Sequence, residues 1–272
     1  MLVYVDDILV TGNRLSDVNS FIAALSSCFV TRDLGDFKFF LGIEAVKQSN
    51  GALLLSQKQY MIDLLKKANM LNCKPVSTPM STSTSTDEAS LADLSFSTSV
   101  DPTLYRQLVG SLQYLTLTRP DLSYAVNRVC QHMHAPTAEH FGLVKRILRY
   151  VKSTIELDLL ITPSRDFTIQ AFSDADWADS SSDCRSTGGY VVYLGSNIVS
   201  WQSKKQRTHI EIDFHFVREK VARKQLQVQF ISTKDQIADV LTKPLSTARF
   251  VFFRSKLRLC SRKPFACERS IR

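Results

Sequence analysis

Leu2-Val3-Tyr4-Val5-Asp6-Asp7-Ile8-Leu9-Val10 is the most informative stretch of this chain, because it sets two adjacent carboxylates between two short apolar runs. Short β-forming runs around an acidic turn are typical of a tight hairpin. Like charges this close either raise one pKa or require a cation, and two-metal nucleotidyl transfer uses such carboxylates to hold Mg²⁺. Asp is also a common turn residue, so the pair taken alone indicates no more than a turn.

Further motifs follow the hairpin in a fixed order along nearly the whole chain. They include Ser-Asp-Ala-Asp-Trp at 173–177 and Thr-Arg-Pro-Asp-Leu-Ser-Tyr at 118–124. Together with Tyr-Val-Asp-Asp at 4–7, these motifs resemble the reverse transcriptase and ribonuclease H regions of Ty1/copia-type retrotransposon Pol polyproteins. The other matching segments are 33–44, 55–60, 73–80, 105–116, 185–190, 200–206 and 235–245.

The resemblance implies a mixed α+β / α/β fold, in which a partial reverse transcriptase palm and thumb/connection precede a truncated ribonuclease H-like fold. The expected segments are 1–76, the C-terminal part of the palm and start of the thumb; 77–100, a Ser/Thr-rich linker; 101–163, a helical thumb/connection region; 164–245, a ribonuclease H-like domain with an internal deletion at 207/208; and 246–272, a basic tail.

The same resemblance assigns catalytic and metal-binding roles to four carboxylates. Asp6 and Asp7 match the polymerase site, whereas Asp174 and Asp239 match the first and last acidic positions of ribonuclease H, the latter on the final helix. The family cofactor is Mg²⁺, and the family partner is an RNA–DNA hybrid or primer-template.

Both sites are expected to be incomplete. The chain starts at Met1, without the upstream palm strand that bears another aspartate in the family. At 207/208 it is expected to lack the segment that carries two further ribonuclease H carboxylates in the family. Other acids of the second region, Asp176, Asp183, Glu211 and Asp213, are not expected to substitute, because Mg²⁺ demands near-octahedral oxygen ligands. The chain is therefore predicted to be a catalytically inactive fragment of a Pol polyprotein.

Two alternatives stay open: a non-catalytic nucleic-acid-binding remnant, or pieces of an active Pol protein joined by a faulty gene assignment. Lys145, Arg146 and Arg149 lie on a predicted helix that the family places near the primer-template, and they are candidate phosphate contacts. A row of cations on an amphipathic helix also fits a plain solvated face.

Charge and cysteine content bound the remaining possibilities. The formal net charge is +8, and residues 249–272 carry +7 of it, which suits phosphate binding or a solvated end. The six cysteines have no paired spacing, and no apolar run approaches the length of a membrane span. An intracellular protein without a membrane role is expected; nucleus, cytoplasm and organelle are not distinguished.

Periodicity predicts helices over 16–29, 57–70, 105–117 and 122–133, and from about 136. A hairpin is predicted for 37–46 and 51–55, around the turn signal Asn50-Gly51. Alternation predicts three antiparallel strands at 167–172, 188–194 and 197–201.

Overall fold

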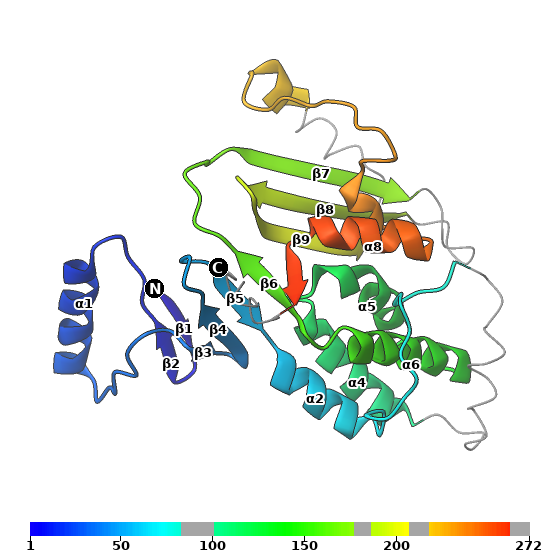
Figure 1. Cartoon of the computed structure of the whole chain (residues 1–272), viewed down its shortest axis with the longest axis horizontal. Coiled ribbons are helices and arrows are strands. Elements are labelled where there is room, and N and C mark those ends of the chain that lie inside the picture. Colours follow the sequence, from blue (N-terminus) through cyan, green and yellow to red (C-terminus); the bar gives the residue numbers. More distant parts are fainter. Residues whose placement is uncertain (83–100, 177–185, 207–217, 262–272) are drawn as a thin grey trace, which may run out of the picture.

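The computed structural model describes residues 1–82, 101–176, 186–206 and 218–261. At one end of the molecule, β1 (Leu2–Tyr4) and β2 (Asp7–Leu9) pair antiparallel and α1 (Leu15–Cys28) follows them (Figure 1). The predicted hairpin is thus confirmed, with Val5 at a positive φ of 46° in its turn. The helix begins one residue earlier than predicted, and no residue of α1 is fully buried.

The next layer is a five-stranded antiparallel sheet in the order β10-β6-β5-β4-β3. Its first three strands are β3 (Phe39–Phe40), β4 (Ile43–Lys47) and β5 (Leu53–Ser56). The single strand predicted over 37–46 is interrupted, because Leu41 and Gly42 both adopt positive φ. The Asn50-Gly51 turn is confirmed between β4 and β5, with Gly51 at φ 81°.

The other two strands of this sheet were not predicted. They are β6 (Leu157–Ile161) and β10 (Leu259–Ser261), which pair with each other. Strand β6 also pairs with β5, so the sheet joins segments predicted to belong to the palm, the connection region and the basic tail.

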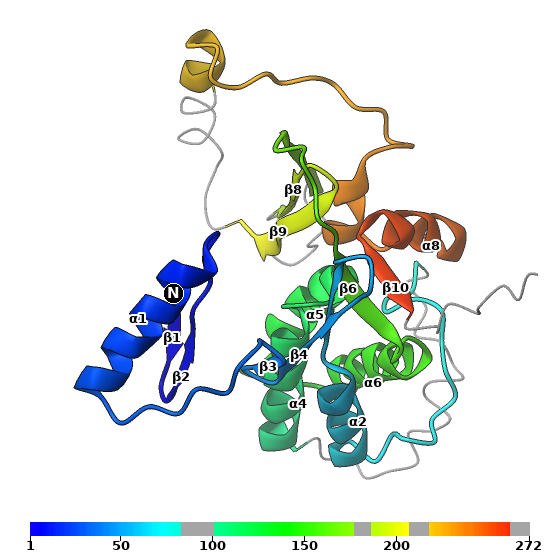
Figure 2. The same ribbon diagram turned by 60° about the vertical axis from the view of Figure 1, so that its left-hand side comes forward.

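A cluster of helices packs beside this sheet (Figure 2). The predicted helical segments are confirmed with shorter or shifted bounds, and Pro120 occupies the first turn of a short 3-10 helix. The elements are α2 (Lys58–Lys67), α4 (Pro102–Leu115), η1 (Pro120–Leu122), α5 (Ser123–Cys130) and α6 (Ala138–Ser153).

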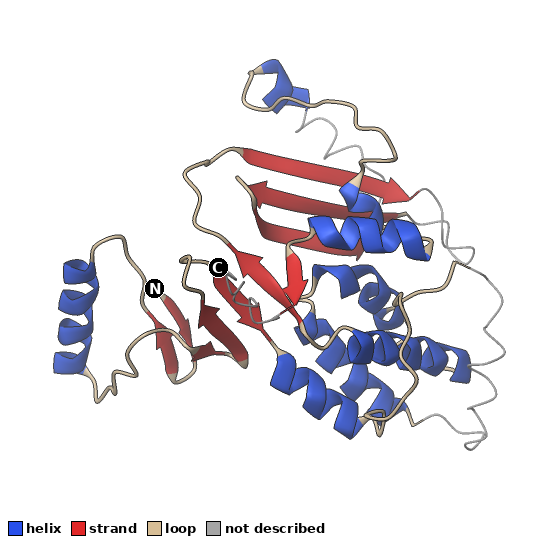
Figure 3. Cartoon of the chain, viewed as in Figure 1, coloured by secondary structure: helices blue, strands red, loops and turns tan. Residues whose placement is uncertain are grey.

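A separate three-stranded antiparallel sheet has the order β7-β8-β9, as predicted (Figure 3). Its strands are β7 (Ile169–Asp176), β8 (Thr187–Leu194) and β9 (Asn197–Lys205). The 3-10 helix η2 (Ile237–Leu241) and then α8 (Thr247–Lys256) follow it in the chain. Asp239 therefore lies on a short 3-10 helix and not on the final helix, which corrects the prediction.

One cluster of buried side chains connects these layers. It includes Leu65 of α2, Leu112 of α4, Ile147 of α6, Val191 of β8 and Phe253 of α8, each fully or almost fully buried. The helical layer and the three-stranded sheet thus share a core. In the described part of the chain, no helix is long and apolar enough to cross a membrane.

The predicted basic tail, 246–272, begins as folded structure. Phe250 and Phe253 of α8 are buried, because they lie on the helix face that packs on the core, and Arg249 and Arg254 of the same helix contact groups inside the fold. The predicted linker, 77–100, likewise begins with the buried residues Thr78 and Pro79. Residues 83–100 and 262–272 and the 207/208 junction lie outside the described residues.

Candidate functional site

Asp174 and Asp239 come together between β7 and η2. Asp174 is on β7 opposite Gly189 of β8, and η2 lies across that point of the sheet. A Cβ at Gly189 would lie 2.7 Å from Cβ of Leu241, so only glycine lets η2 approach the sheet this closely. The Asp174 side chain keeps 21% of its surface exposed and that of Asp239 only 2%.

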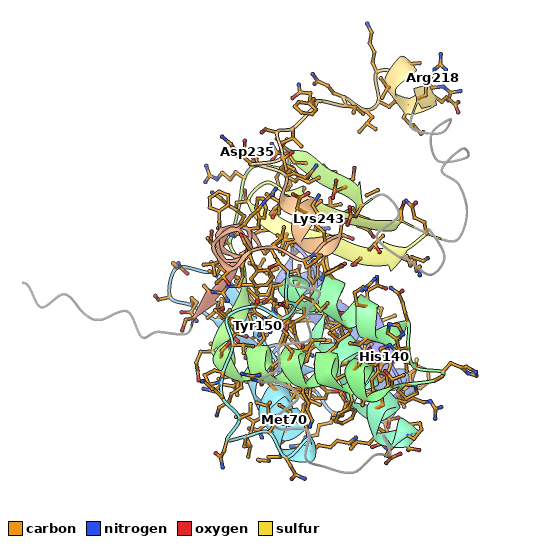
Figure 4. All side chains as sticks on the ribbon, turned by 90° about the vertical axis from the view of Figure 1, so that its right-hand side faces the viewer. Met70, His140, Tyr150, Arg218, Asp235 and Lys243 are labelled. Carbon is orange, nitrogen blue, oxygen red and sulfur yellow. The ribbon has the colours of Figure 1, made fainter. Side chains whose placement is uncertain are left out.

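A lysine ammonium bridges the two carboxylates. Nζ of Lys243 lies 3.3 Å from Oδ2 of Asp174 and 3.0 Å from Oδ1 of Asp239. The Thr242 hydroxyl donates to Oδ2 of Asp174 at 2.6 Å, and the Arg249 guanidinium pairs with Oδ2 of Asp239. Figure 4 shows Lys243 beside the three-stranded sheet, well away from His140. Two cations therefore neutralise the two carboxylates.

The pKa values of this cluster follow from burial and charge together. Burial raises the pKa of Asp239, and the negative charge of Asp174 raises it further. Lys243 and Arg249 lower this pKa, but the net shift is upward. Burial also opposes ionisation of Asp174, but Thr242 and Lys243 outweigh it and lower its pKa. Burial likewise opposes the charge of Lys243, whose pKa is nevertheless raised by the two carboxylates. The arrangement favours a charged Lys243 against an ionised Asp174.

These donors do not fit a Mg²⁺ site as they stand. Among the described residues, no group of three or more His, Cys, Asp or Glu side chains gathers where a metal ion could bind. Mg²⁺ prefers an octahedral shell of oxygen atoms, whereas the space between Asp174 and Asp239 is taken by a cationic nitrogen. Asp183, Glu211 and Asp213 lie outside the described residues.

Asp6 and Asp7 occupy a different part of the molecule. Both are exposed at the end of the β1–β2 hairpin, and Asp7 is opposite Tyr4 in the register. The hairpin stands apart from the three-stranded sheet that carries Asp174 (Figure 1). The structure thus places Asp174 and Asp239 close together, in contact with Lys243. It leaves Asp6 and Asp7 on a separate two-stranded sheet.

The three predicted phosphate-binding cations lie on α6 and contact the chain itself. Nη2 of Arg146 donates to the Thr78 hydroxyl at 3.1 Å, and Nε of Arg149 donates to the Lys74 carbonyl at 2.8 Å. The Lys145 ammonium lies over the Phe141 ring at 5.6 Å. Arg146 and Arg149 therefore hold the segment after α2 against α6, and their contact with nucleic acid stays a prediction.

Sequence reasoning missed a buried ion pair in the Thr-Arg-Pro-Asp motif. Arg119 and Asp121 are both fully buried and form a two-pronged contact, Nε–Oδ1 at 2.9 Å and Nη2–Oδ2 at 2.8 Å. The Tyr150 hydroxyl donates to Asp121 at 2.5 Å, and Arg119 also donates to the Thr154 carbonyl at 3.1 Å. In the sequence, only the two opposite charges on either side of Pro120 hinted at this network.

A groove between α4, α5 and β9 was also missed. Its volume is about 510 Å³, and its lining includes Gln113, Asn127 and Trp201. The Trp201 indole donates to the Thr116 carbonyl at 2.9 Å, which fixes the ring between the sheet and the helices. The sequence signal was one carboxamide on each helix, Gln113 and Asn127, which becomes informative only once β9 is placed beside them.

The hairpin and the mixed α/β architecture are compatible with a reverse transcriptase-like fold. Residues 1–82 match the family model described as reverse transcriptase (RNA-dependent DNA polymerase). Retrovirus-related Pol polyproteins from transposons RE2 and RE1 of Arabidopsis thaliana are 40% identical over 318 residues, which cover 94% of this chain and 21% of each polyprotein. An uncharacterized mitochondrial protein of Arabidopsis thaliana is 48% identical over 208 residues, 76% of this chain and 84% of that protein.

The chain belongs to the family of Ty1/copia-type retrotransposon Pol polyproteins. It spans about a fifth of the length of the transposon RE1 and RE2 polyproteins. No solved structure matches it.

The two kinds of relative differ in how many aligned positions lack a residue of this chain. The alignment with the transposon RE2 polyprotein has 318 positions, yet 94% of 272 residues is about 256, so about 62 positions have no residue of this chain. The alignment with the mitochondrial protein has 208 positions for 76% of the chain, or about 207 residues, and needs no such gap. The long relatives therefore contain residues, within the aligned stretch, that this chain lacks.

Proposed function

We propose that this chain is a catalytically silent part of a Ty1/copia-type Pol protein. On this proposal, residues 1–76 correspond to the reverse transcriptase palm and start of the thumb, 101–163 to the helical thumb/connection, and 164–245 to a shortened ribonuclease H-like domain. The similarity to transposon Pol polyproteins supports the parent protein, and the order of the motifs supports the assignment of its parts.

The observation that carries the proposal is the Lys243 bridge. An ammonium within 3.3 Å of Asp174 and 3.0 Å of Asp239 supplies the positive charge that a metal would otherwise supply. A lysine cannot orient an attacking water and a leaving oxygen as two metal ions do. The positions absent from the alignment with the transposon RE2 polyprotein are consistent with loss of the remaining carboxylates.

The polymerase half is proposed to be silent for a related reason. Among the described residues, Asp6 and Asp7 have no third acidic, histidine or cysteine partner with which to hold a metal ion. Phosphoryl transfer depends on positioning and charge stabilisation together, so an isolated exposed pair is expected to give almost none of the rate.

The test is a pair of assays with Mg²⁺: cleavage of an RNA–DNA hybrid and extension of a primer on an RNA template. We expect no product above that of a variant carrying Asp6→Asn, Asp7→Asn, Asp174→Asn and Asp239→Asn. A parallel reaction with an active ribonuclease H and an active reverse transcriptase confirms that the substrates are competent. Product from the wild-type chain that disappears in the quadruple variant overturns the proposal.

A second candidate function is nucleic-acid binding without catalysis. It is favoured by the cations around His132. Burial and the neighbouring His140 lower the pKa of His132, and the positive charges of Arg128 on α5 and Lys205 on β9 lower it further. These two elements thus bring positive charge to one side of the molecule. Binding of this kind weakens steeply with added salt, so titration of an oligonucleotide at two salt concentrations tests it.

A further inference from the structure

Two histidine rings lie face to face where α5 and α6 meet. His132 follows the end of α5, and His140 lies on the first turn of α6 (Figure 4). Their ring centroids are 3.6 Å apart and their planes differ by 13°, so the rings are stacked. Both side chains are half-buried, whereas His134, on the turn between the helices, is exposed. The stacked pair therefore joins the two ends of the turn 131–137.

His140 also caps the helix on which it lies. Its Nδ1 accepts a hydrogen bond from the Thr137 backbone N–H at 3.1 Å, and the Thr137 hydroxyl accepts one from the His140 backbone N–H at 3.4 Å. This reciprocal pair is a capping box, which satisfies amide groups that a helix otherwise leaves unpaired at its start. Because Nδ1 is the acceptor, the proton of the neutral ring is on Nε2.

Protonation of His140 is incompatible with this cap. The added proton goes on Nδ1, where it points at the Thr137 N–H, so that two donors face each other. The ring is also next to the positive end of the α6 dipole, which disfavours a cation there. A charged His140 must therefore turn away from Thr137, and this movement disrupts its stack with His132.

The groups around the pair favour its neutral form. Burial and then the neighbouring His140 lower the pKa of His132, and the charges of Arg128 on α5 and Lys205 on β9 lower it further. Burial lowers the pKa of His140 as well, against the opposite effect of the Glu139 carboxylate. Both rings are therefore neutral at neutral pH.

A further cation faces the turn from α4. Nε of Arg106 donates to the Met133 carbonyl at 2.9 Å, and its Nη2 donates to the His134 carbonyl at 3.5 Å. These two hydrogen bonds hold the middle of the turn and involve no histidine side chain. The effect of a proton on the histidine pair is therefore expected at the two ends of the turn.

We propose that His132 and His140 form a pH-sensitive contact, which fixes the start of α6 when both rings are neutral and releases it when His140 is protonated. A released histidine takes up a proton near its ordinary pKa of about 6.5, whereas the stacked rings take one up only at lower pH. The contact is thus complete above about pH 6.5 and is lost as the pH falls from there toward the lowered pKa values. It depends on neither catalysis nor nucleic-acid binding, so it goes beyond the function proposed above.

The first test follows the whole chain by NMR between about pH 8 and about pH 5. Spectra of the imidazole nitrogens report which ring nitrogen carries a proton, and amide spectra report Thr137. We expect His140 to carry its proton on Nε2 at the upper pH, to titrate below about pH 6.5, and to shift the Thr137 amide resonance with the same midpoint. His134, exposed on the same turn, is the internal comparison, and the Thr137 resonance should not follow it.

Two glutamine variants separate the cap from the charge. In the wild type, the hydrogen-exchange protection of the Thr137 and Phe141 amides, corrected for the intrinsic rate, should fall about fivefold on acidification, as for loss of a helix cap. In His140→Gln the side-chain carbonyl can still accept from the Thr137 N–H, but nothing titrates, so the fall should disappear. The matched His134→Gln should leave the fall unchanged.

Three outcomes overturn the proposal. The first is a neutral His140 ring with its proton on Nδ1, because such a ring cannot accept from Thr137. The others are protection that stays constant with pH in the wild type, and protection that falls equally in His140→Gln. If His140→Gln does not fold, as judged by circular dichroism, the wild-type titration decides alone, because the Thr137 resonance either follows His140 or does not.

Discussion

At the scale of single residues, Arg119 and Asp121 stabilise the helical core through an ion pair that is closed to water. Burial alone opposes the charge of Arg119, but Asp121 raises the pKa of the guanidinium, so Arg119 is charged in the folded state. A buried pair of this kind stabilises little relative to apolar residues, yet removal of one partner leaves an uncompensated charge.

Breaking this pair should be costly. We expect Asp121→Asn to lower the free energy of unfolding by about 3–5 kcal/mol, because Arg119 then stays buried without a counter-charge. Urea denaturation followed by circular dichroism measures this change. Asp63→Asn, which removes the exposed Lys66–Asp63 pair, is the matched control and should leave the urea midpoint unchanged. Equal midpoints for Asp121→Asn and the wild type would show that the pair does not support the core.

The sequence predicted Asp174 and Asp239 as partners but not Lys243. The two aspartates were given roles by the family resemblance, whereas Lys243, in the same matching segment as Asp239, was given none. Its role depends on η2 turning the chain so that residues 239 and 243 share one side, next to β7. The contact between Lys243 and Asp174, 69 residues apart in the chain, comes from tertiary packing and leaves no local signal.

At the scale of elements, the α8 helix overturns the expectation of a solvated basic tail. Several of its cations have partners inside the fold: Arg249 pairs with Asp239, and Arg254 donates to the Tyr150 hydroxyl at 3.2 Å. Just beyond the helix, Arg258 donates to the Thr162 hydroxyl at 2.9 Å. Net charge by composition therefore overstates what this segment offers to a phosphate backbone.

Two adjacent phenylalanines of α8 give a matched test. Phe253 is fully buried, whereas Phe252 is 47% exposed. We expect Phe253→Ala to lower the free energy of unfolding by about 3–5 kcal/mol and Phe252→Ala to cost much less, since only the first leaves a cavity. Thermal and urea denaturation of both variants provide the comparison. Similar losses from the two variants would contradict the placement of α8 in the core.

Elements with strong local signals were predicted, and those without them were not. The Asn50-Gly51 turn and the apolar stripe of α6 fixed their elements from sequence, because turn chemistry and helical periodicity are local. Strands β6 and β10 are short apolar runs, which pattern alone does not separate from helix ends or loops. Their pairing with each other and with β5 depends on the whole sheet.

At the scale of the whole molecule, one core runs from α2 to the segment after α8. The segments proposed as connection region and ribonuclease H-like domain therefore support each other, and the β1–β2 hairpin with α1 contributes no buried residue to that core. Loss of chemistry at Asp174 and Asp239 is compatible with a stable fold, because Lys243 and Arg249 neutralise the two carboxylates from within.

The most direct measurement of the central claim is a calorimetric titration of Mg²⁺, and separately Mn²⁺, into the wild-type chain and into Asp174→Asn. We expect no saturable binding of either ion that depends on Asp174, because Lys243 already occupies the position between the carboxylates. Saturable binding in the wild type that is lost in Asp174→Asn would contradict this expectation and would show that the pair still holds a metal ion.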